Sequence, residues 1–305
     1  MTDSQPLVSI LIITMNHEKF IEQACRSAIE QTYANKEIIF LDNHSEDQTA
    51  RLARNILEKS GLPVTFVETD SRKIVSINLN LMLARASGKY LAILSGDDWW
   101  LPELIEQKVQ FASANSSDYV LSDGFKYLQD SGEITAAYPA GEKERIIKTL
   151  PRFFHENVAG NRTVNVGTFV KTELLKKEPF DENIQTEDWD MNLRFAHQGH
   201  RIHFLDKKLF YYRVLSNSVS RNISIMEESY RKVTAKYLDY ILAHDDTRTE
   251  YQLNELLFKY EKLLSDAASE SEKEKIRLRW KAEKYDVKYK NPVRFIKKLL
   301  LKISG

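Results

Sequence analysis

The chain contains one cysteine, which excludes an internal disulfide and a metal site built from paired thiolates. This residue, Cys25, lies in an apolar helical stretch and is expected to be a small core residue. A content of one cysteine is typical of a protein in a reducing compartment. The first 20 residues have no basic flank before a short apolar run, so we expect neither a signal peptide nor a membrane span. The sequence therefore predicts a cytoplasmic protein, either soluble or peripheral to a membrane.

The chain also has no excess of charge of either sign. Its 44 basic and 44 acidic residues give a formal net charge of zero. No overall field attracts such a protein to nucleic acid, and any basic patch must be local. We therefore expect no nucleic-acid partner.

Apolar runs of strand length alternate with helical segments in the first half of the sequence. Continuous β-rich runs occupy residues 8–13, 37–42, 64–69 and 90–95. Unbroken apolar runs are typical of strands that are covered on both faces, as in parallel sheets. The sequence thus predicts an α/β fold with a Rossmann-like, mostly parallel central sheet flanked by helices. Ser45 and Gln48 resemble a capping box at the start of the second helix.

The second half is less regular. A helix is expected over 103–114 and another over 187–199, and strands are expected over 118–128, 165–172 and 209–214. The weaker pattern over 131–165 is expected to include a loop or a subdomain that faces an acceptor. From about residue 223 the sequence consists of long charged segments with Leu, Tyr and Ile at helical spacing. We therefore predict two parts, an α/β domain over 1–222 and a C-terminal α-helical extension over 223–305.

Acidic residues cluster at three places where the predicted strands end or a helix begins. Asp42 ends the second strand, Asp97 and Asp98 follow the fourth, and Glu187 and Asp188 open a later helix. In doubly wound sheets, ligands bind at the carboxyl ends of the strands. Adjacent carboxylates need a cation or a raised pKa, and oxygen ligands suit Mg²⁺ or Mn²⁺ bound to substrate phosphates. The alternatives are a solvated turn at 97–98 and helix-dipole stabilisation at 187–188.

Longer motifs resemble a known family. The segment "VSILIITMNHEKFIEQACRSAIEQTYANKEIIFLDNHSEDQT" is similar to the opening of the inverting family-two nucleotide-sugar glycosyltransferases. "NLMLARASGKYLAILSGDDWWLP", "TEDWDMNLRFAHQGHRIHFL" and "YYRVLSNSVSR" resemble its later motifs. The resemblance spans roughly residues 7 to 221 and implies a GT-A fold, a nucleotide-diphospho-sugar donor and a divalent metal, Mn²⁺ or Mg²⁺.

The resemblance also implies roles for individual residues. Asp188 would be the catalytic base, with Glu187 orienting the acceptor or Asp188 itself, and Asp98 would bind the metal. The residues implied in nucleotide-sugar binding are Asp42, Asn43, Asn80, Asp97 and Arg213. A carboxylate near the proton of a sugar hydroxyl helps to deprotonate it as it attacks the anomeric carbon, and a metal offsets the charge on the departing diphosphate. For Arg213, a structural ion pair is as good an explanation as a diphosphate contact.

Three positions depart from the family pattern. Ser95 stands where the family often has the first Asp of Asp-x-Asp, Leu215 where many members have a histidine, and Asn43 where a second Asp is usual. Asn both donates and accepts hydrogen bonds, whereas an ionised Asp only accepts, so Asn43 weakens a uracil assignment. Among the donors, UDP and dTDP sugars are nevertheless favoured.

The sequence therefore predicts a metal-dependent inverting glycosyltransferase. It would transfer a sugar, a hexose or a related one, to a glycan or a lipid-linked acceptor hydroxyl, with bacterial surface-polysaccharide synthesis as the setting that the resemblance implies. A catalytically silent nucleotide- or glycan-binding protein, or a scaffolding protein of the same fold, is the main alternative, for which the three departures speak. A nucleotidyltransferase is a third hypothesis, against which the later motifs speak.

The C-terminal end is locally basic. Ile296, Leu299, Leu300 and Ile303 share one helical face, and seven basic residues but one acid lie between 284 and 302. A basic amphipathic helix of this kind binds anionic membrane surfaces, which suits a lipid-linked acceptor. The alternatives are docking on the chain's own domain or on a second subunit, so the sequence leaves a homo-oligomer open.

Overall fold

The computed structural model describes residues 5–215 and 223–289. Contacts divide the chain into two compact units, of which the first comprises residues 1–154 and 162–229 and the second residues 155–161 and 230–305. The division falls within helix α9 (Ile223–Ala235). The boundary that we predicted at residue 222, like the predicted basic helix at the C-terminus, lies outside the described residues. Each unit is described on its own.

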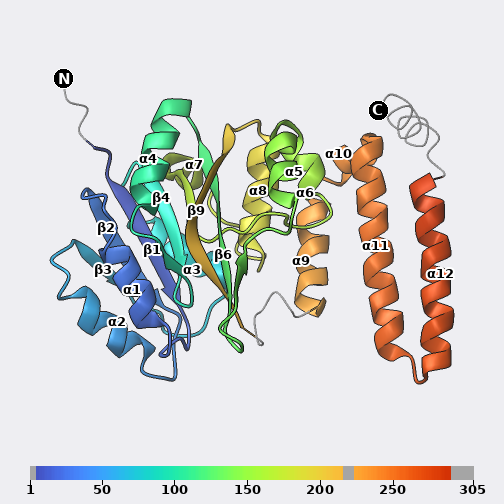
Figure 1. Cartoon of the computed structure of the whole chain (residues 1–305), viewed down its shortest axis with the longest axis horizontal. Coiled ribbons are helices and arrows are strands. Elements are labelled where there is room, and N and C mark those ends of the chain that lie inside the picture. Colours follow the sequence, from blue (N-terminus) through green and yellow to red (C-terminus); the bar gives the residue numbers. More distant parts are fainter. Residues whose placement is uncertain (1–4, 216–222, 290–305) are drawn as a thin grey trace. The chain divides into compact units, whose positions relative to one another are not determined.

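The first unit contains a nine-stranded sheet whose order is β3-β2-β1-β4-β8-β6-β9-β5, with β7 paired to β6. Its N-terminal half is parallel (Figure 1) and is formed by β1 (Val8–Thr14), β2 (Lys36–Asp42), β3 (Val64–Val67) and β4 (Tyr90–Ser95). Ile10, Leu11 and Ile12 of the central strand β1 are fully buried. Burial on both faces explains why these strands are apolar runs and not alternating ones.

The other half of the sheet is mixed. It comprises β5 (Trp99–Trp100), β6 (Tyr119–Leu128), β7 (Ile134–Ala136), β8 (Thr168–Lys171) and β9 (Ile202–Val214). Strand β8 is antiparallel to both β4 and β6, β6 and β9 are parallel, and β5 and β7 pair in antiparallel fashion. Strand β9 pairs with β6 on either side of an irregular middle stretch. Its residues Phe210 and Tyr211 pair with β5, which directly follows the acidic turn at 97–98.

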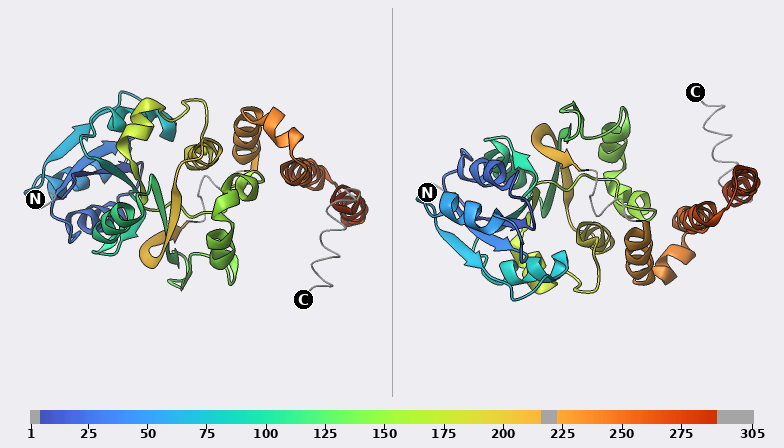
Figure 2. Two further views of the ribbon diagram at one scale, coloured as in Figure 1. Left: turned by 90° about the horizontal axis from the view of Figure 1, so that it is seen from above. Right: turned by 90° about the horizontal axis from the view of Figure 1, so that it is seen from below.

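Helices cover both faces of the sheet. Helices α1 (Ile21–Ile29) and α2 (Thr49–Leu57) lie on one face and α3 (Val75–Leu83) on the other (Figure 2). This follows from right-handed crossovers, because the chain steps from β1 to β2 to β3 in one direction and then returns past β1 to β4. The remaining helices of this unit are α4 (Leu104–Asn115), α5 (Glu142–Thr149), η1 (Leu150–Arg152), α6 (Phe153–Asn157), α7 (Thr172–Lys177) and α8 (Glu187–His197), with α6 continuing into the second unit.

The second unit is helical and includes α10 (Leu238–Ala243), α11 (Asp245–Asp266) and α12 (Glu270–Tyr289). Helices α11 and α12 form an antiparallel hairpin. Across this hairpin the Tyr260 hydroxyl donates to Glu283 Oε1 at 2.6 Å, and Lys259 Nζ bonds Glu283 Oε2 at 2.9 Å. Tyr260 is 1% exposed, so the packing of this one aromatic side chain and its hydrogen bond join the two helices.

The predicted α/β fold with flanking helices and a helical C-terminal part is confirmed. The expected capping box is wrong: α2 begins at Thr49 with Gln48 as its N-cap and no side-chain cap bond, because Ser45 is bound to Asp42 instead. Three strands also differ in length from the prediction, since β3 ends at Val67, β8 begins only at Thr168 and β9 begins at Ile202. Among the described residues no helix combines the length and the apolarity needed to cross a membrane.

Candidate active site

The carboxyl ends of three neighbouring parallel strands meet at one edge of the sheet. Asp42, the last residue of β2, pairs with Thr14 of β1, and Ser95, the last residue of β4, pairs with Ile13 of the same strand. The turn that carries Asp97 therefore starts at the same level as Asp42, as the sequence predicted. This edge is where α/β sheets bind their ligands.

Hydrogen bonds join the loop after β1 to the loop after β2. Asn16 N donates to Ser45 Oγ at 2.8 Å, and His17 N donates to Thr49 Oγ1 at 2.7 Å. Asp47 Oδ1 in turn accepts from Thr49 N at 2.9 Å. Asn16 has a left-handed backbone with φ of 55°, which asparagine tolerates better than most residues. These residues of the family motif thus bond to one another and fix the two loops.

Asp42 and Asn43 both hold backbone at the end of β2. Asp42 accepts from Ser45 twice, from N at 2.8 Å and from Oγ at 2.6 Å. The buried Asn43 amide donates to Lys73 O at 2.8 Å and accepts from Lys73 N at 2.9 Å. Because an ionised aspartate cannot donate, only asparagine makes both bonds. The departure at Asn43 is therefore explained by its attachment of the loop that precedes α3.

The turn at 95–98 is tightly constrained. Gly96 N donates to Ile13 O at 2.8 Å, and a Cβ atom at residue 96 would lie 2.4 Å from Thr14 Oγ1. The Ser95 hydroxyl donates to Asp97 Oδ1. Ser95, which replaces a usual aspartate, thus holds the Asp97 carboxylate and adds no third negative charge to the turn.

Asp98 is a buried carboxyl, 5% exposed. Its Oδ1 accepts from Arg213 N at 2.8 Å. Burial, followed by the charge of Asp97, raises the pKa of Asp98 well above its ordinary value, while the bond and the charge of Arg213 oppose the shift. A cation beside this carboxyl favours its ionised form.

Arg213 links three parts of the first unit. Its Nε donates to Asp97 O at 2.7 Å, Nη1 to Gln129 Oε1 at 2.5 Å and Nη2 to Gln23 Oε1 at 2.6 Å. The guanidinium also lies 4.7 Å from the ring centre of Trp99. Burial lowers the pKa of Arg213. The structure thus gives Arg213 a structural function in the acidic turn, and its contact with a diphosphate stays a prediction.

Glu187 and Asp188 lie in the first turn of α8, and Figure 1 shows this helix beside β9. Asp188 Oδ2 accepts from Asn165 Nδ2 at 3.1 Å, and Oδ1 accepts from Trp189 N at 2.7 Å. Burial, followed by the negative charge of Asp188, raises the pKa of Glu187 to about 8. Glu187 therefore keeps its proton at neutral pH, which the negative charge of Asp188 favours.

Asn80 makes a different set of contacts from those of the acidic turn. In helix α3, its Nδ2 donates to Phe180 O at 2.9 Å and to Glu182 Oε1 at 3.1 Å, and its Oδ1 accepts from Phe180 N at 3.0 Å. These bonds attach α3 to the segment that leads into α8. They account for Asn80 structurally, and its contact with a donor stays a prediction.

No three His, Cys, Asp or Glu side chains gather into a metal cluster within residues 5–215 and 223–289. The structure adds residues that sequence reasoning missed, namely Gln23 and Gln129 on Arg213 and Asn165 on Asp188. A single amide carries no motif signal, and the partners of these three lie 23 to 190 residues away. Only the fold brings them together.

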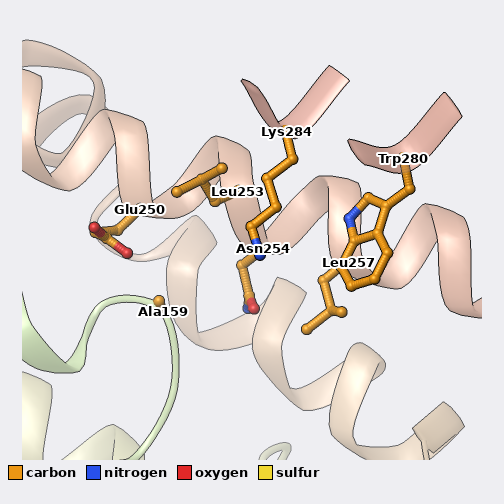
Figure 3. A pocket seen from close by; sticks show the side chains of 7 residues that line it. All are labelled: Ala159, Glu250, Leu253, Asn254, Leu257, Trp280 and Lys284. Atoms are coloured by element: carbon orange, nitrogen blue, oxygen red, sulfur yellow. The ribbon is translucent and has the colours of Figure 1, made fainter. Parts of the chain in front are cut away.

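A separate pocket of about 220 Å³ lies within the helical unit (Figure 3). Leu253, Asn254 and Leu257 of α11 and Trp280 of α12 contribute to its lining, with Ala159 at one side. None of the predicted site residues lines it.

The family model described as glycosyl transferase family 2 matches residues 9–181, which is more than half of the chain. The chain belongs to this family, and the predicted resemblance is confirmed.

The matches to several relatives cover more of the chain than the family model does. The chain is 26% identical to an uncharacterized glycosyltransferase of Methanocaldococcus jannaschii, over 69% of this chain and 71% of that protein. It is 25% identical to the putative teichuronic acid biosynthesis glycosyltransferase TuaG of Bacillus subtilis, over 73% and 84%. It is 27% identical to the UDP-Glc:alpha-D-GlcNAc-diphosphoundecaprenol beta-1,3-glucosyltransferase WfaP of Escherichia coli, over 71% and 80%. The relatives thus include enzymes named for bacterial polysaccharide biosynthesis.

Solved structures share the fold. S. aureus TarS 1–349 in complex with UDP-GlcNAc superposes with a TM-score of 0.64 at 19% identity, covering 92% of this chain and 81% of that one. The mannosyltransferase PcManGT from Pyrobaculum calidifontis, in complex with GDP-Man and Mn²⁺, superposes with a TM-score of 0.57 at 17% identity, over 96% and 72%. The predicted GT-A fold is thereby confirmed.

Proposed function

We propose that the chain is an inverting, metal-dependent glycosyltransferase that transfers a sugar, a hexose or a related one, from a nucleotide diphosphate to a hydroxyl of a glycan or a lipid-linked acceptor. The observation that carries this proposal is the carboxylate pair Asp97–Asp98 at the carboxyl edge of the sheet, in a chain that belongs to a glycosyltransferase family. UDP is the favoured nucleotide, since TarS was solved with UDP-GlcNAc and WfaP is named for UDP-Glc.

The residues of the acidic turn suit a divalent cation. Asp98 is buried with a raised pKa, and Arg213 N bonds only Oδ1, which leaves Oδ2 for a ligand. Hard oxygen ligands that leave room for water and phosphate oxygens are those of Mg²⁺ and Mn²⁺. We propose Asp98 as the protein ligand, with Asp97 beside it. When bound, such an ion offsets the negative charge that develops on the leaving diphosphate.

The pair at the start of α8 supplies the proton chemistry. Asp188 accepts the proton of the acceptor hydroxyl, whose oxygen forms a bond to the anomeric carbon from the face opposite the leaving group. The bond between that carbon and the phosphate oxygen breaks, and its electron pair leaves with the nucleoside diphosphate. The configuration of the anomeric carbon is inverted. Glu187, protonated at neutral pH because its pKa is about 8, donates a hydrogen bond to the acceptor or to Asp188.

The other residues named for donor binding frame the nucleotide. Asp42 and Asn43 lie where the base enters, Asp97 near the ribose, and Arg213 beside the diphosphate. Asn80 sets the position of the segment before α8. The setting that we propose is bacterial surface-polysaccharide synthesis at the cytoplasmic face of the membrane, which the names of the relatives support.

A catalytically silent nucleotide- or glycan-binding protein of the same fold is the second candidate. It is favoured by the internal bonds of Asn43 and Arg213, which engage two groups named for donor binding. Activity and binding must therefore be measured separately.

Titration calorimetry with UDP, dTDP and GDP, each with and without Mn²⁺, tests donor binding. We expect metal-dependent binding of UDP or dTDP that Asp98→Asn removes. Asp239→Asn, which changes an exposed aspartate of the helical unit, is the matched control and keeps the binding. Absence of nucleotide binding under all conditions refutes the transferase proposal.

A panel of nucleotide sugars then tests catalysis by release of the sugar to water. Asp188→Asn is expected to bind the donor as the unmodified chain does and to release sugar at least a hundredfold more slowly, since general-base catalysis contributes roughly 10²–10⁴-fold. If the unmodified chain binds the donor but releases no sugar, with or without added acceptor glycans, it is the silent binding protein instead.

A further inference from the structure

Asn165 contacts the proposed base and is itself held from two sides. It lies three residues before β8, and its Nδ2 donates to Asp188 Oδ2 at 3.1 Å. Its Oδ1 accepts from Thr163 Oγ1 at 2.7 Å and, in a longer contact, from the Tyr119 hydroxyl at 3.4 Å. Thr163 Oγ1 also accepts from Asn192 Nδ2 at 2.9 Å. A chain of hydrogen bonds therefore runs from the middle of α8 back to its first turn through the loop before β8.

The direction of each bond in this chain is determined. An ionised carboxylate only accepts, so the Asn165 amide must turn its nitrogen toward Asp188. Its oxygen then faces Thr163, whose hydroxyl must donate to it. That hydroxyl can accept only from a donor, which is the amide nitrogen of Asn192. The Asn165 amide nitrogen donates to Asp188 Oδ2, and a hydrogen bond to a carboxylate favours its charged form.

A buried lysine also holds the loop that carries Asn165. Lys108, 1% exposed, donates from Nζ to Gly167 O at 2.6 Å and to Val120 O at 3.3 Å. Asn165 O also accepts from Thr168 Oγ1 at 2.9 Å. The position of Asn165 is thus fixed by its backbone as well as by its side chain.

We propose that Asn165 is a positioning residue, which orients the Asp188 carboxylate for proton abstraction and favours its charged form, and that Thr163 fixes the orientation of the Asn165 amide. This inference rests on the proposed function of Asp188 as the base. The titratable groups that interact electrostatically with Asp188 include Glu187 on its own helix and Tyr119 on β6. Glu187 opposes a charge on Asp188, and the amide of Asn165 favours it.

The first test measures the pKa of Asp188 without any substrate. The chain is labelled with ¹³C at the aspartate carboxyls, and the Asp188 signal is assigned by its loss in Asp188→Asn. In Asn165→Ala we expect the pKa of Asp188 to rise by about one unit, because a hydrogen bond to a charged group is worth roughly that much. Asn115→Ala, which removes an exposed amide that donates to Phe111 O, is the matched control and leaves the pKa unchanged. An unchanged pKa in Asn165→Ala overturns the proposal.

A pair of variants at Thr163 keeps the test decisive if Asn165→Ala does not fold. Thr163→Val keeps the shape but removes the hydroxyl, whereas Thr163→Ser keeps the hydroxyl. We expect Thr163→Val to raise the pKa of Asp188 in the same direction as Asn165→Ala, and Thr163→Ser to retain the original pKa. A merely structural role of the methyl group predicts the reverse order.

The second test uses sugar release from UDP-GlcNAc, UDP-glucose and GDP-mannose with Mn²⁺. For each donor that is hydrolysed, Asn165→Ala is expected to lower kcat about ten- to hundredfold, to leave the donor KM unchanged and to move the acid limb of the kcat–pH profile upward. If Asp188→Asn hydrolyses at the original rate, the proposed function of Asp188 is refuted. If Asp188→Asn is inactive while Asn165→Ala keeps the original rate and pH profile, only the present inference is refuted.

Discussion

Replacing Glu187 with glutamine measures how strongly the first turn of α8 opposes a second negative charge. The pKa of this carboxyl is raised from 4.5 to about 8, first by burial and then by the charge of Asp188. Below pH 4.5 the group is protonated in the folded and the unfolded chain alike. Between pH 4.5 and 8 the folded chain keeps a proton that the unfolded chain has lost, so the free energy of unfolding falls as the pH rises.

The expected magnitude follows from this interval. One group that titrates only in the unfolded state lowers the free energy of unfolding by up to about 1.4 kcal/mol per pH unit. Because the Glu187 side chain is partly exposed and solvent screens its charge, we expect a total loss of about 2–3 kcal/mol by pH 9 and not the full linkage value. Glutamine has nearly the same shape and no charge. Glu187→Gln should therefore match the unmodified chain at pH 5 and be more stable at pH 9.

The assay is urea denaturation followed by tryptophan fluorescence at intervals between pH 5 and 9. The matched control is Glu173→Gln, which changes an exposed glutamate in the first turn of α7. The difference in free energy between Glu187→Gln and the unmodified chain should grow with pH, whereas that of the control should stay constant. A constant difference for Glu187→Gln as well refutes the assignment of the proton to Glu187.

Two further changes test the scaffold of the site. Gly96→Ala places a Cβ atom 2.4 Å from Thr14 Oγ1. We expect this variant to lower the free energy of unfolding by at least about 2 kcal/mol, measured by urea denaturation, and to weaken donor binding. A variant of unchanged stability refutes the tight packing of the turn. Burial lowers the pKa of Lys108 to about 7, so the unfolded chain binds more protons between pH 7 and 10, and stability contributed by this residue rises with pH there. Lys108→Met should remove that rise, and it should also destabilise the loop at Gly167, whose carbonyl loses its donor; a pH dependence equal to that of the unmodified chain contradicts this account.

Much of the parallel half of the sheet was predictable because burial on both faces leaves a plain signal. Runs 8–13 and 90–95 are apolar without interruption, and β1 and β4 fall there within a residue. Strand β9 was predicted only over 209–214, because its middle, from Asp206 to Lys208, is exposed and polar, and its pairing with β6 is irregular there although the two strands pair on either side. Periodicity reports what a strand buries and not how far its backbone is paired.

The candidate site was predictable to a different degree. Asp42 and Asp97 lie at the same edge of the sheet because each stands at or just after the end of a parallel strand. The strands and these two positions are both visible in the sequence, so this edge was predictable. The partners of those carboxylates do not follow, because Gln23 reaches Arg213 across 190 residues and nothing in a lone glutamine distinguishes it. The burial of Asp98 and the proton of Glu187 are likewise properties of the packed structure.

The bonds between Asn16, Ser45, His17 and Thr49 have a consequence for engineering a change of donor. Three of them, Asn16, Ser45 and Thr49, match the family motif, and the bonds among the four residues hold the two loops together. A library that varies them would sample unfolded loops more than new specificities. The loop over 68–74 is held by the amide of Asn43, by the Thr69 hydroxyl, which donates to Asp42 O, and by the ion pair between Arg72 and Glu46. Variation of its exposed residues Asp70 and Ser71 leaves the bonds between the two motif loops intact. Attempts to change the donor specificity should therefore vary the loop over 68–74 and keep the four bonded motif-loop residues unchanged.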